Sequence, residues 1–268
     1  GKTTTINMII RYFEAAGLDI FLGAPTGRAA KRMTEATGFE ARTLHRMLEL
    51  NSALYLGGLT PSLGTLILTK KNTDLKVIAM VRPRGAGFCY SAADFEVMKA
   101  DAELLLQNGA DGIAFGCLNE NGEIEENQTR EMTGIIKKHH GEAVFHRAFD
   151  CVQDPCKAIE ILIDIGIDRI LTSGGQEKAV DGIELLAKLQ KEYGERIELL
   201  AGSGMNAGNA AELMERTGIR QVHSSCRGWL PDPTTEGPQV SYAYAEPPHR
   251  KDYEAVDKNL VKKLVDAL

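Results

Sequence analysis

The feature that most constrains the fold is a short apolar run that ends in polar or ionisable residues and recurs along the chain, followed by an amphipathic stretch. Residues 143–150 form one such run and end with His146, Arg147 and Asp150. Four more runs follow the same scheme: 76–84, 169–175, 197–206 and 221–227. Parallel α/β proteins place their functional sites at the carboxyl ends of strands, so the five tips together predict one shared site. For any single strand, helix capping or a chain turn explains a polar tip equally well.

The spacing of these runs predicts the architecture. We expect seven strands whose starts lie about 24 to 36 residues apart, the size of one strand–helix unit: 47–51, 76–83, 112–118, 143–150, 169–172, 197–201 and 221–225. Helices are expected at 92–108, 129–140, 155–165, 181–193, 207–217 and 255–268. So many alternating units predict an α/β fold of the TIM type, a (β/α)8 barrel, with one of eight strands not visible in this pattern.

Composition limits the kind of protein. The 268 residues are 43% hydrophobic, enough for a substantial core, and the net charge of −6 disfavours a general nucleic-acid surface. The five cysteines are scattered without a C-x-x-C pair, which fits reduced thiols. We expect no signal peptide, and the sequence contains no apolar run of roughly 18 residues. We therefore expect a cytoplasmic protein with neither nucleic-acid nor membrane partners.

The first segment has a pattern of its own. Gly1, Lys2 and Thr3 match the end of a phosphate-binding loop whose glycine-rich first half is absent. Together with the sequence APTGRAAKRM at 24–33, residues 1 to about 47 resemble the start of the motor domain of RecD-like DNA helicases. That resemblance implies that 1–46 is a fragment of a P-loop NTPase. No later acidic magnesium-binding strand follows, so we expect no ATP use.

The remainder of the chain carries a second resemblance. The sequences GGLTPS at 57–62, FHRAFD at 145–150 and LTSGG at 171–175 occur in that order and resemble the CutC family. The family is named for copper homeostasis and folds as a TIM-type barrel. The resemblance covers about 47–268 and implies a cytosolic copper-binding or copper-handling barrel with a polar site at the strand ends. The family's first strand and helix are missing, and the helicase-like fragment stands in their place, which suggests a chimeric sequence.

A substitute for the missing unit is present in the first segment. Residues 18–23 read as an apolar strand and 27–36 as a helix, followed by the strand predicted at 47–51. Strand, helix and strand thus come in the order that a first βα unit requires. We predict that 18–36 replaces this unit, with 18–23 pairing in parallel with 47–51 to close the barrel.

The polar tips supply a set of candidate catalytic residues: Glu49, Arg82, His146, Arg147 and Asp150. The arginines suit a carboxylate or phosphate, and His146 with Asp150 or Glu49 suits proton transfer. A structural salt bridge between Glu49 and an arginine is the alternative for that residue. This chemistry leads to a second function hypothesis, a TIM-barrel enzyme that acts on a small phosphate- or carboxylate-bearing metabolite. Whether the chain is an enzyme stays open at this point.

Two glycine-rich tips end consecutive predicted strands. Barrels often bind phosphate at such tips through backbone N–H groups. The candidate cofactor-binding residues are Ser173, Gly174, Gly175, Gly202, Ser203, Gly204 and Asn206. Tight turns account for the glycines equally well.

Copper is the ligand that the family resemblance implies. Cu(I) prefers thiolates and thioethers, and Cu(II) prefers imidazoles. The candidate ligands are Cys117, Cys151, His223 and Cys226, which form no compact motif. The expected partner is thus a copper ion or a small anionic metabolite, and the chain could form a homo-oligomer. A third hypothesis is a vestigial ATP-binding helicase fragment without activity.

Overall fold

The computed structural model describes residues 22–24, 41–43, 58–243 and 245–268. The chain divides into two compact units, Gly1–Leu50 and Asn51–Leu268. In the first unit, β1 (Leu22–Ala24) pairs in parallel with β2 (Ala41–Thr43), with Leu22 opposite Ala41. The partner predicted for the 18–23 strand, residues 47–51, lies outside the described residues, and so does the helix predicted at 27–36.

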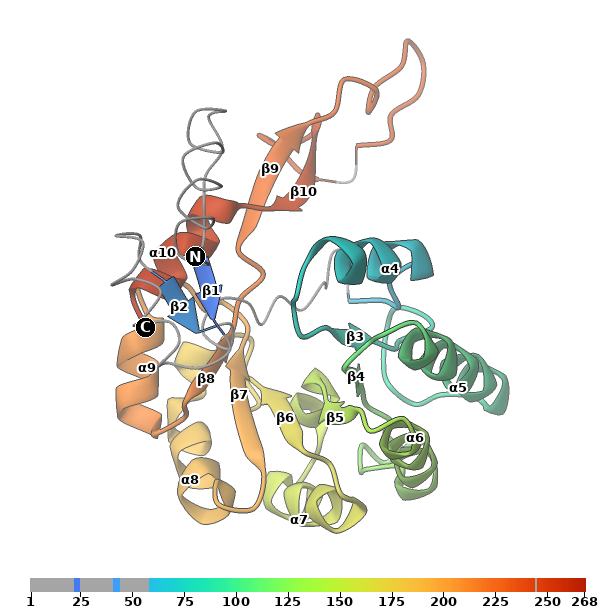
Figure 1. Ribbon diagram of the computed structural model, residues 1–268, viewed down its shortest axis with the longest axis vertical. Helices are drawn as coiled ribbons and strands as arrows, with labels where there is room; N and C mark the ends of the chain where they lie inside the picture. The colour runs from blue at the N-terminus through green and yellow to red at the C-terminus, as the bar shows by residue number, and fades with distance from the viewer. Residues whose placement is uncertain (1–21, 25–40, 44–57, 244) are drawn as a thin grey trace, which may run out of the picture. The chain divides into compact units, whose positions relative to one another are not determined.

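The second unit contains a parallel sheet of six strands in the spatial order β3-β4-β5-β6-β7-β8. Their bounds are β3 Ile78–Met80, β4 Gly112–Phe115, β5 Glu142–Phe145, β6 Arg169–Thr172, β7 Glu198–Gly202 and β8 Gln221–His223. Spatial order follows chain order, so each strand is joined to its neighbour by a crossover connection. The sheet is curled and the helices cover its outer face (Figure 1). The TIM-barrel-like fold class is therefore confirmed, with six barrel strands in the described residues.

Local signals explain where the helices begin and end. The helices are α4 Leu63–Asn72, α5 Ala92–Gln107, α6 Glu126–Lys138, α7 Pro155–Ile165, α8 Ile183–Tyr193, α9 Ala210–Thr217 and α10 Lys258–Asp266. Asp154 caps α7 by accepting the N–H groups of Cys156 and Lys157, both at 3.0 Å, and Pro155 takes the first helical position. Gly166 ends α7 at φ 91°, a left-handed conformation that favours glycine.

The two faces of the sheet differ in what they meet. Ile113, Phe145 and Ile170 belong to the core that the strands share with the helices. Val144 and Leu171 alternate with these residues along β5 and β6, are also buried, and therefore line the concave face. Side chains that continue this alternation past the strand ends reach the carboxyl-side mouth of the curled sheet.

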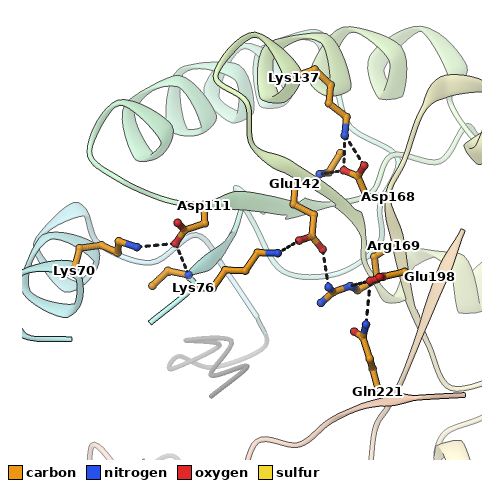
Figure 2. Close-up of polar contacts among 11 residues, drawn as sticks. Lys70, Lys76, Asp111, Lys137, Glu142, Asp168, Arg169, Glu198 and Gln221 are labelled. Carbon is orange, nitrogen blue, oxygen red and sulfur yellow. Dashed lines mark hydrogen bonds and ion pairs between the residues drawn. The ribbon is translucent and has the colours of Figure 1, made fainter. Parts of the chain in front are cut away.

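The amino ends of the strands are held by a repeated contact (Figure 2). The Asp111 carboxylate accepts the N–H of Val77 and the Nζ of Lys70, both at 2.7 Å. Asp168 does the same two strands later, accepting the N–H of Ala143 at 2.7 Å and Lys137 Nζ at 2.6 Å. Each aspartate thereby links the start of its own strand to the start of the strand before.

A row of ion pairs crosses the same edge of the sheet (Figure 2). Lys76 pairs with Glu142. Arg169 contacts both Glu142 and Glu198, each at 3.0 Å. Gln221 donates to Glu198 at 3.0 Å. The Arg169 side chain is only 8% exposed, and a buried charge of this kind needs paired carboxylates. The amino side is therefore occupied by charges that pair with one another.

The C-terminal region differs from the sequence prediction. The sequence predicts no strand after 221–225, but β9 (Arg227–Pro231) and β10 (Asp252–Val256) form an antiparallel hairpin that extends away from the sheet (Figure 1). The Pro- and Gly-rich composition belongs to the connection between the two strands. Because β10 takes residues 252–256, α10 begins at Lys258 instead of at 255. No helix in the described part of the chain is long and apolar enough to cross a membrane.

Candidate functional site

The strand predicted at 143–150 ends earlier, at Phe145. The ring of His146 accepts the N–H of Ala148 at 3.1 Å through Nδ1, and Arg147–Cys151 forms a 3-10 turn. A side chain that accepts a backbone donor two residues ahead turns the chain out of the sheet. The alternation of a strand therefore does not apply beyond His146, and Arg147 and Asp150 are placed by the turn.

Asp150 lies nearly buried between this turn and the tip of β6. Its carboxylate accepts Arg147 Nε at 2.7 Å, Thr172 Oγ1 at 2.6 Å and the N–H groups of Ser173 and Gly175 at 2.9 and 3.1 Å. The side chain is 7% exposed. The lone pairs of the carboxylate oxygens therefore accept hydrogen bonds from donors of the protein itself. Asp150 therefore ties two loops together, and the two N–H groups of the LTSGG tip point to it.

Arg147 is held in one orientation by the same network. Its Nη2 donates to Ser173 Oγ at 2.8 Å and to the carbonyl oxygen of Gln176 at 3.1 Å, while Nε faces Asp150. Among the residues that the structure describes, Nη1 has no partner, and the side chain is 40% exposed. A planar, permanently charged group is thus anchored on one side and accessible on the other.

His146 is buried at the ends of β3, β4 and β5. Its ring packs on Phe88 with the centroids 5.0 Å apart and lies over Gly116, where an added Cβ would stand 2.6 Å from Nδ1. Burial, and then the charge of Arg82, lower the pKa of His146 to about 3. The imidazole is therefore neutral at ordinary pH, and within the described part of the chain Nε2 makes no hydrogen bond.

Arg82 follows β3 and contributes the positive charge that acts on His146. Its guanidinium carbon lies 4.9 Å from the centroid of the Phe88 ring, and Nη2 donates to the carbonyl oxygen of Ala86. The backbone is fixed by Thr60, which donates its N–H to the Arg82 carbonyl oxygen at 3.0 Å and accepts the Arg82 N–H at 3.0 Å.

The tips of β6 and β7 lie side by side. Ser203 Oγ donates to the carbonyl oxygen of Glu177 at 2.6 Å, and the Ser203 carbonyl oxygen accepts the N–H of Ala179 at 3.0 Å. Asn206 stabilises its own turn, since its Oδ1 accepts the N–H of Gly208 at 2.8 Å. Gly174 is in the left-handed region at φ 70°, and an added Cβ would stand 2.5 Å from the Gly182 carbonyl oxygen. Turn geometry and close packing thus account for this glycine.

The remaining glycines of the two tips have their own surroundings. An added Cβ on Gly202 would stand 3.3 Å from His223 Cβ, and one on Gly204 would stand 3.3 Å from Lys178 Cγ. His223, on β8, is partly buried, and no hydrogen bond among the described residues involves its ring. Burial, followed by the charge of Arg147, lowers the pKa of His223 to about 4. A second neutral imidazole therefore stands at the mouth of the sheet.

The sulfur candidates are distributed over several elements. Cys117 is fully buried after β4, and burial raises the pKa of its thiol to about 12. Cys226 is buried, with its Sγ 3.5 Å from Ser224 Oγ. Cys151 is exposed. Within the described ranges, no three or more His, Cys, Asp or Glu side chains gather where they could hold a metal ion. Glu49 lies outside these ranges.

Arg147, Asp150 and Ser173 are thus in direct contact, with His146, Arg82 and His223 around the same mouth. Sequence reasoning missed Thr172 and Gln176, which complete the network. The LTSGG motif contains Thr172, but only the fold shows that its hydroxyl donates to Asp150. Gln176 contributes through its backbone oxygen, which no side-chain pattern reveals.

Comparisons with known proteins agree on one family. The model of the CutC family matches residues 33–228, so the match includes part of the segment likened to a helicase. A "family protein CutC" of Treponema denticola is 42% identical over 222 residues, covering 82% of this chain and 89% of the relative. The human "Copper homeostasis protein cutC homolog" is 39% identical over 180 residues, covering 67% of this chain and 65% of that relative.

A solved structure shows the same fold. The structure of CutC from Streptococcus agalactiae superimposes with a TM-score of 0.60 at 28% identity. The superposition covers 65% of this chain and 90% of that one.

Proposed function

Because the chain belongs to the CutC family, we propose that it acts in copper homeostasis, binding and handling a copper ion as its cargo in the cytoplasm. The observation that carries the proposal is the family match over 33–228, joined by relatives that are named copper homeostasis proteins. The carboxyl-side mouth of the sheet is the proposed location.

The donor chemistry of this mouth supports the proposal. A neutral imidazole can donate a nitrogen lone pair to a metal, and His223 is kept neutral by its surroundings. The thiols of Cys117, Cys151 and Cys226 are donors of the kind that Cu(I) prefers. Because the pKa of buried Cys117 is raised, copper binding there would have to displace its proton.

Copper titration tests the proposal. Cu(I) is added anaerobically to each chain in competition with a chromogenic chelator. The chains are the parent and the four donor variants Cys117→Ser, Cys151→Ser, Cys226→Ser and His223→Ala. The control is Arg147→Ala. We expect one or more of the four donor variants to bind at least about tenfold more weakly and Arg147→Ala to bind normally. Equal Cu(I) affinity in all donor variants, or no binding by the parent chain, contradicts the proposal.

A second function is favoured by the charges at the mouth. The charge of Arg82 lowers the pKa of His146, and the charge of Arg147 lowers that of His223. Two arginines beside two neutral imidazoles suit an enzyme acting on a small phosphate- or carboxylate-bearing metabolite. In such an enzyme His146 would be the proton-transfer group, with Glu49 as its candidate partner. Anion binding that is lost in Arg147→Ala, without loss of Cu(I) binding, favours this function. The third hypothesis, an inactive helicase fragment, rests on residues outside the described ranges.

A further inference from the structure

The helices outside the curled sheet differ in the hydrophobic residues that they expose. In the described part of the chain, no large hydrophobic side chain is exposed on α6, α7, α8 or α9. Helices α4 and α5 expose Ile67, Leu68, Val97 and Leu104, by between 41% and 60%. We name these four residues the α4–α5 face. A helix that covers a sheet ordinarily presents polar residues to solvent, so this face is suited to contact with another protein surface.

The exposed residues of α5 lie in one line along the helix. Ala93, Val97, Ala100 and Leu104 are all exposed, at successive spacings of four, three and four residues. This spacing is that of the seam along which two helices pack, and the alanines leave room for a close approach. The buried residues of α5 are Phe95, Met98, Ala102, Leu105 and Leu106. The exposed line is therefore on the side of α5 opposite the core.

A contact between α5 and α6 shows which flank of α5 this line borders. Lys99 pairs with Glu131 of α6 at 2.8 Å, so Lys99 marks the α6 side of α5. Helix α4 lies on the other side of α5 (Figure 1). Residues two apart in a helix are separated by about 200° around its axis, so Val97 is on the flank toward α4. Leu104, seven residues further on, shares this flank.

Ile67 and Leu68 approach the same border from α4. An added Cβ on Gly109, just past the end of α5, would stand 3.7 Å from Lys70 Cγ, so Lys70 is on the side of α4 toward α5. Ile67 lies three residues before Lys70 and shares its side of the helix. Leu68 comes next and is the most exposed of the four. The α4–α5 face therefore follows the border between the two helices.

The charges beside this face differ between the two helices. Helix α4 carries Lys70 and Lys71 and no acidic residue. Helix α5 carries one lysine and four acidic residues: Asp94, Glu96, Asp101 and Glu103. Two copies that met through α5 alone would oppose like charges, whereas α4 against α5 joins opposite charges. A two-fold axis along the border between α4 and α5 produces the second arrangement twice, because it sets each helix against the other helix of the partner.

We propose that the α4–α5 face binds a second copy of this chain, in a two-fold dimer with α4 of each copy against α5 of its partner. Leu68 and Leu104 then meet across the interface, and exposed Lys71 lies beside the acidic flank of the partner's α5. This face is on helices outside the sheet and not at the strand ends. The proposal therefore depends neither on copper nor on anion binding.

Sedimentation equilibrium of the parent chain, Leu104→Lys and Val240→Asp tests the interface. Val240 is 60% exposed, as Leu68 is, but belongs to the connection between β9 and β10, so it is the matched control. We expect dimers of the parent at about 10–100 μM, a dissociation constant at least about tenfold higher in Leu104→Lys and no change in Val240→Asp. A parent chain that stays monomeric, as it would if this face binds another protein, overturns the proposal. Unchanged affinity in Leu104→Lys also overturns it, and so does dissociation by Val240→Asp, which would assign the contact to the hairpin.

Mixing two charge variants tests which helices meet. In a mixed dimer of Leu68→Glu and Leu104→Lys, the introduced carboxylate faces the introduced amine, and the second α4–α5 contact keeps both leucines. We expect the mixture to associate at least about tenfold more tightly than either variant alone. A mixture as weak as its components overturns the α4-to-α5 arrangement. Far-UV circular dichroism checks the folding of each variant, and Val97→Ser replaces Leu104→Lys in the sedimentation test, with the same criteria, if that variant unfolds.

Discussion

At the scale of single residues, Gly116 shows how the site depends on an absent side chain. An added Cβ would lie 2.6 Å from His146 Nδ1 and 2.8 Å from the Ala148 Cβ. Gly116→Ala should therefore displace the His146 ring and lower the free energy of unfolding by about 1–3 kcal/mol. The control is Gly134→Ala at an exposed position of α6, where an added Cβ meets nothing within 4 Å and should stabilise the chain by about 0.5–1 kcal/mol. Chemical denaturation of both variants measures the difference; equal effects would contradict the steric argument.

His146 should also make stability depend on pH. Its pKa falls from 6.5 to about 3 on folding, so the unfolded chain takes up a proton below pH 6.5 that the folded chain does not. The contribution of His146 to the free energy of unfolding is fully present above pH 6.5. It decreases by about 1.4 kcal/mol per pH unit as the pH falls towards 3. His146→Asn should flatten this slope in denaturation measured between pH 6.5 and 5. His140→Asn, at an exposed position with φ 59°, should retain it.

At the scale of elements, the aspartates before β4 and β6 act as clips between strand starts. Asp168→Ala removes the acceptor for the Ala143 N–H and for Lys137, so we expect unfolding to become easier by about 1–3 kcal/mol. Asp164→Ala, on the exposed end of α7, loses one surface pair with Arg130 and should change stability by less than about 0.5 kcal/mol. Thermal unfolding of the two variants compares them directly. Similar shifts in Tm would mean that the clip contributes no more than a surface pair.

At the scale of the whole molecule, the β9–β10 hairpin is separate from the core. No member of the buried core cluster comes from the described residues of 232–251, the connection between the two strands. Replacing 232–251 by Asn-Gly, a two-residue hairpin turn, should leave the Tm of the barrel within a few degrees. The single tryptophan, Trp229, stacks on His249 at 4.1 Å, so its fluorescence should change with the loss of that partner. A large loss of far-UV helical signal would show that the connection supports the barrel.

The parts of the fold that local chemistry decides were predictable. Asp154 and Pro155 begin α7 as expected, because a cap and the residue after it interact within one turn. Gly109 and Gly166 directly follow the helices predicted at 92–108 and 155–165, and both are left-handed, as is common where a glycine ends a helix. The same short-range reasoning could not find the β9–β10 hairpin, whose strands meet across a long connection.

By itself, the sequence determined the alternating strand–helix order, the residue types at the strand ends and the family, because periodicity, capping and motif order are properties of neighbouring residues. Only the tertiary structure decided what the polar residues do. Asp150 looked like a proton-transfer group, yet it lies 2.6 Å from Thr172 Oγ1, twenty-two residues away, and organises the β6 tip. Arg147 lies on the turn after β5 and His223 on β8, with β6 and β7 between these strands in the sheet, so only the curled sheet brings both to its carboxyl side. A carboxylate's role depends on which donors surround it, and those donors are gathered by folding.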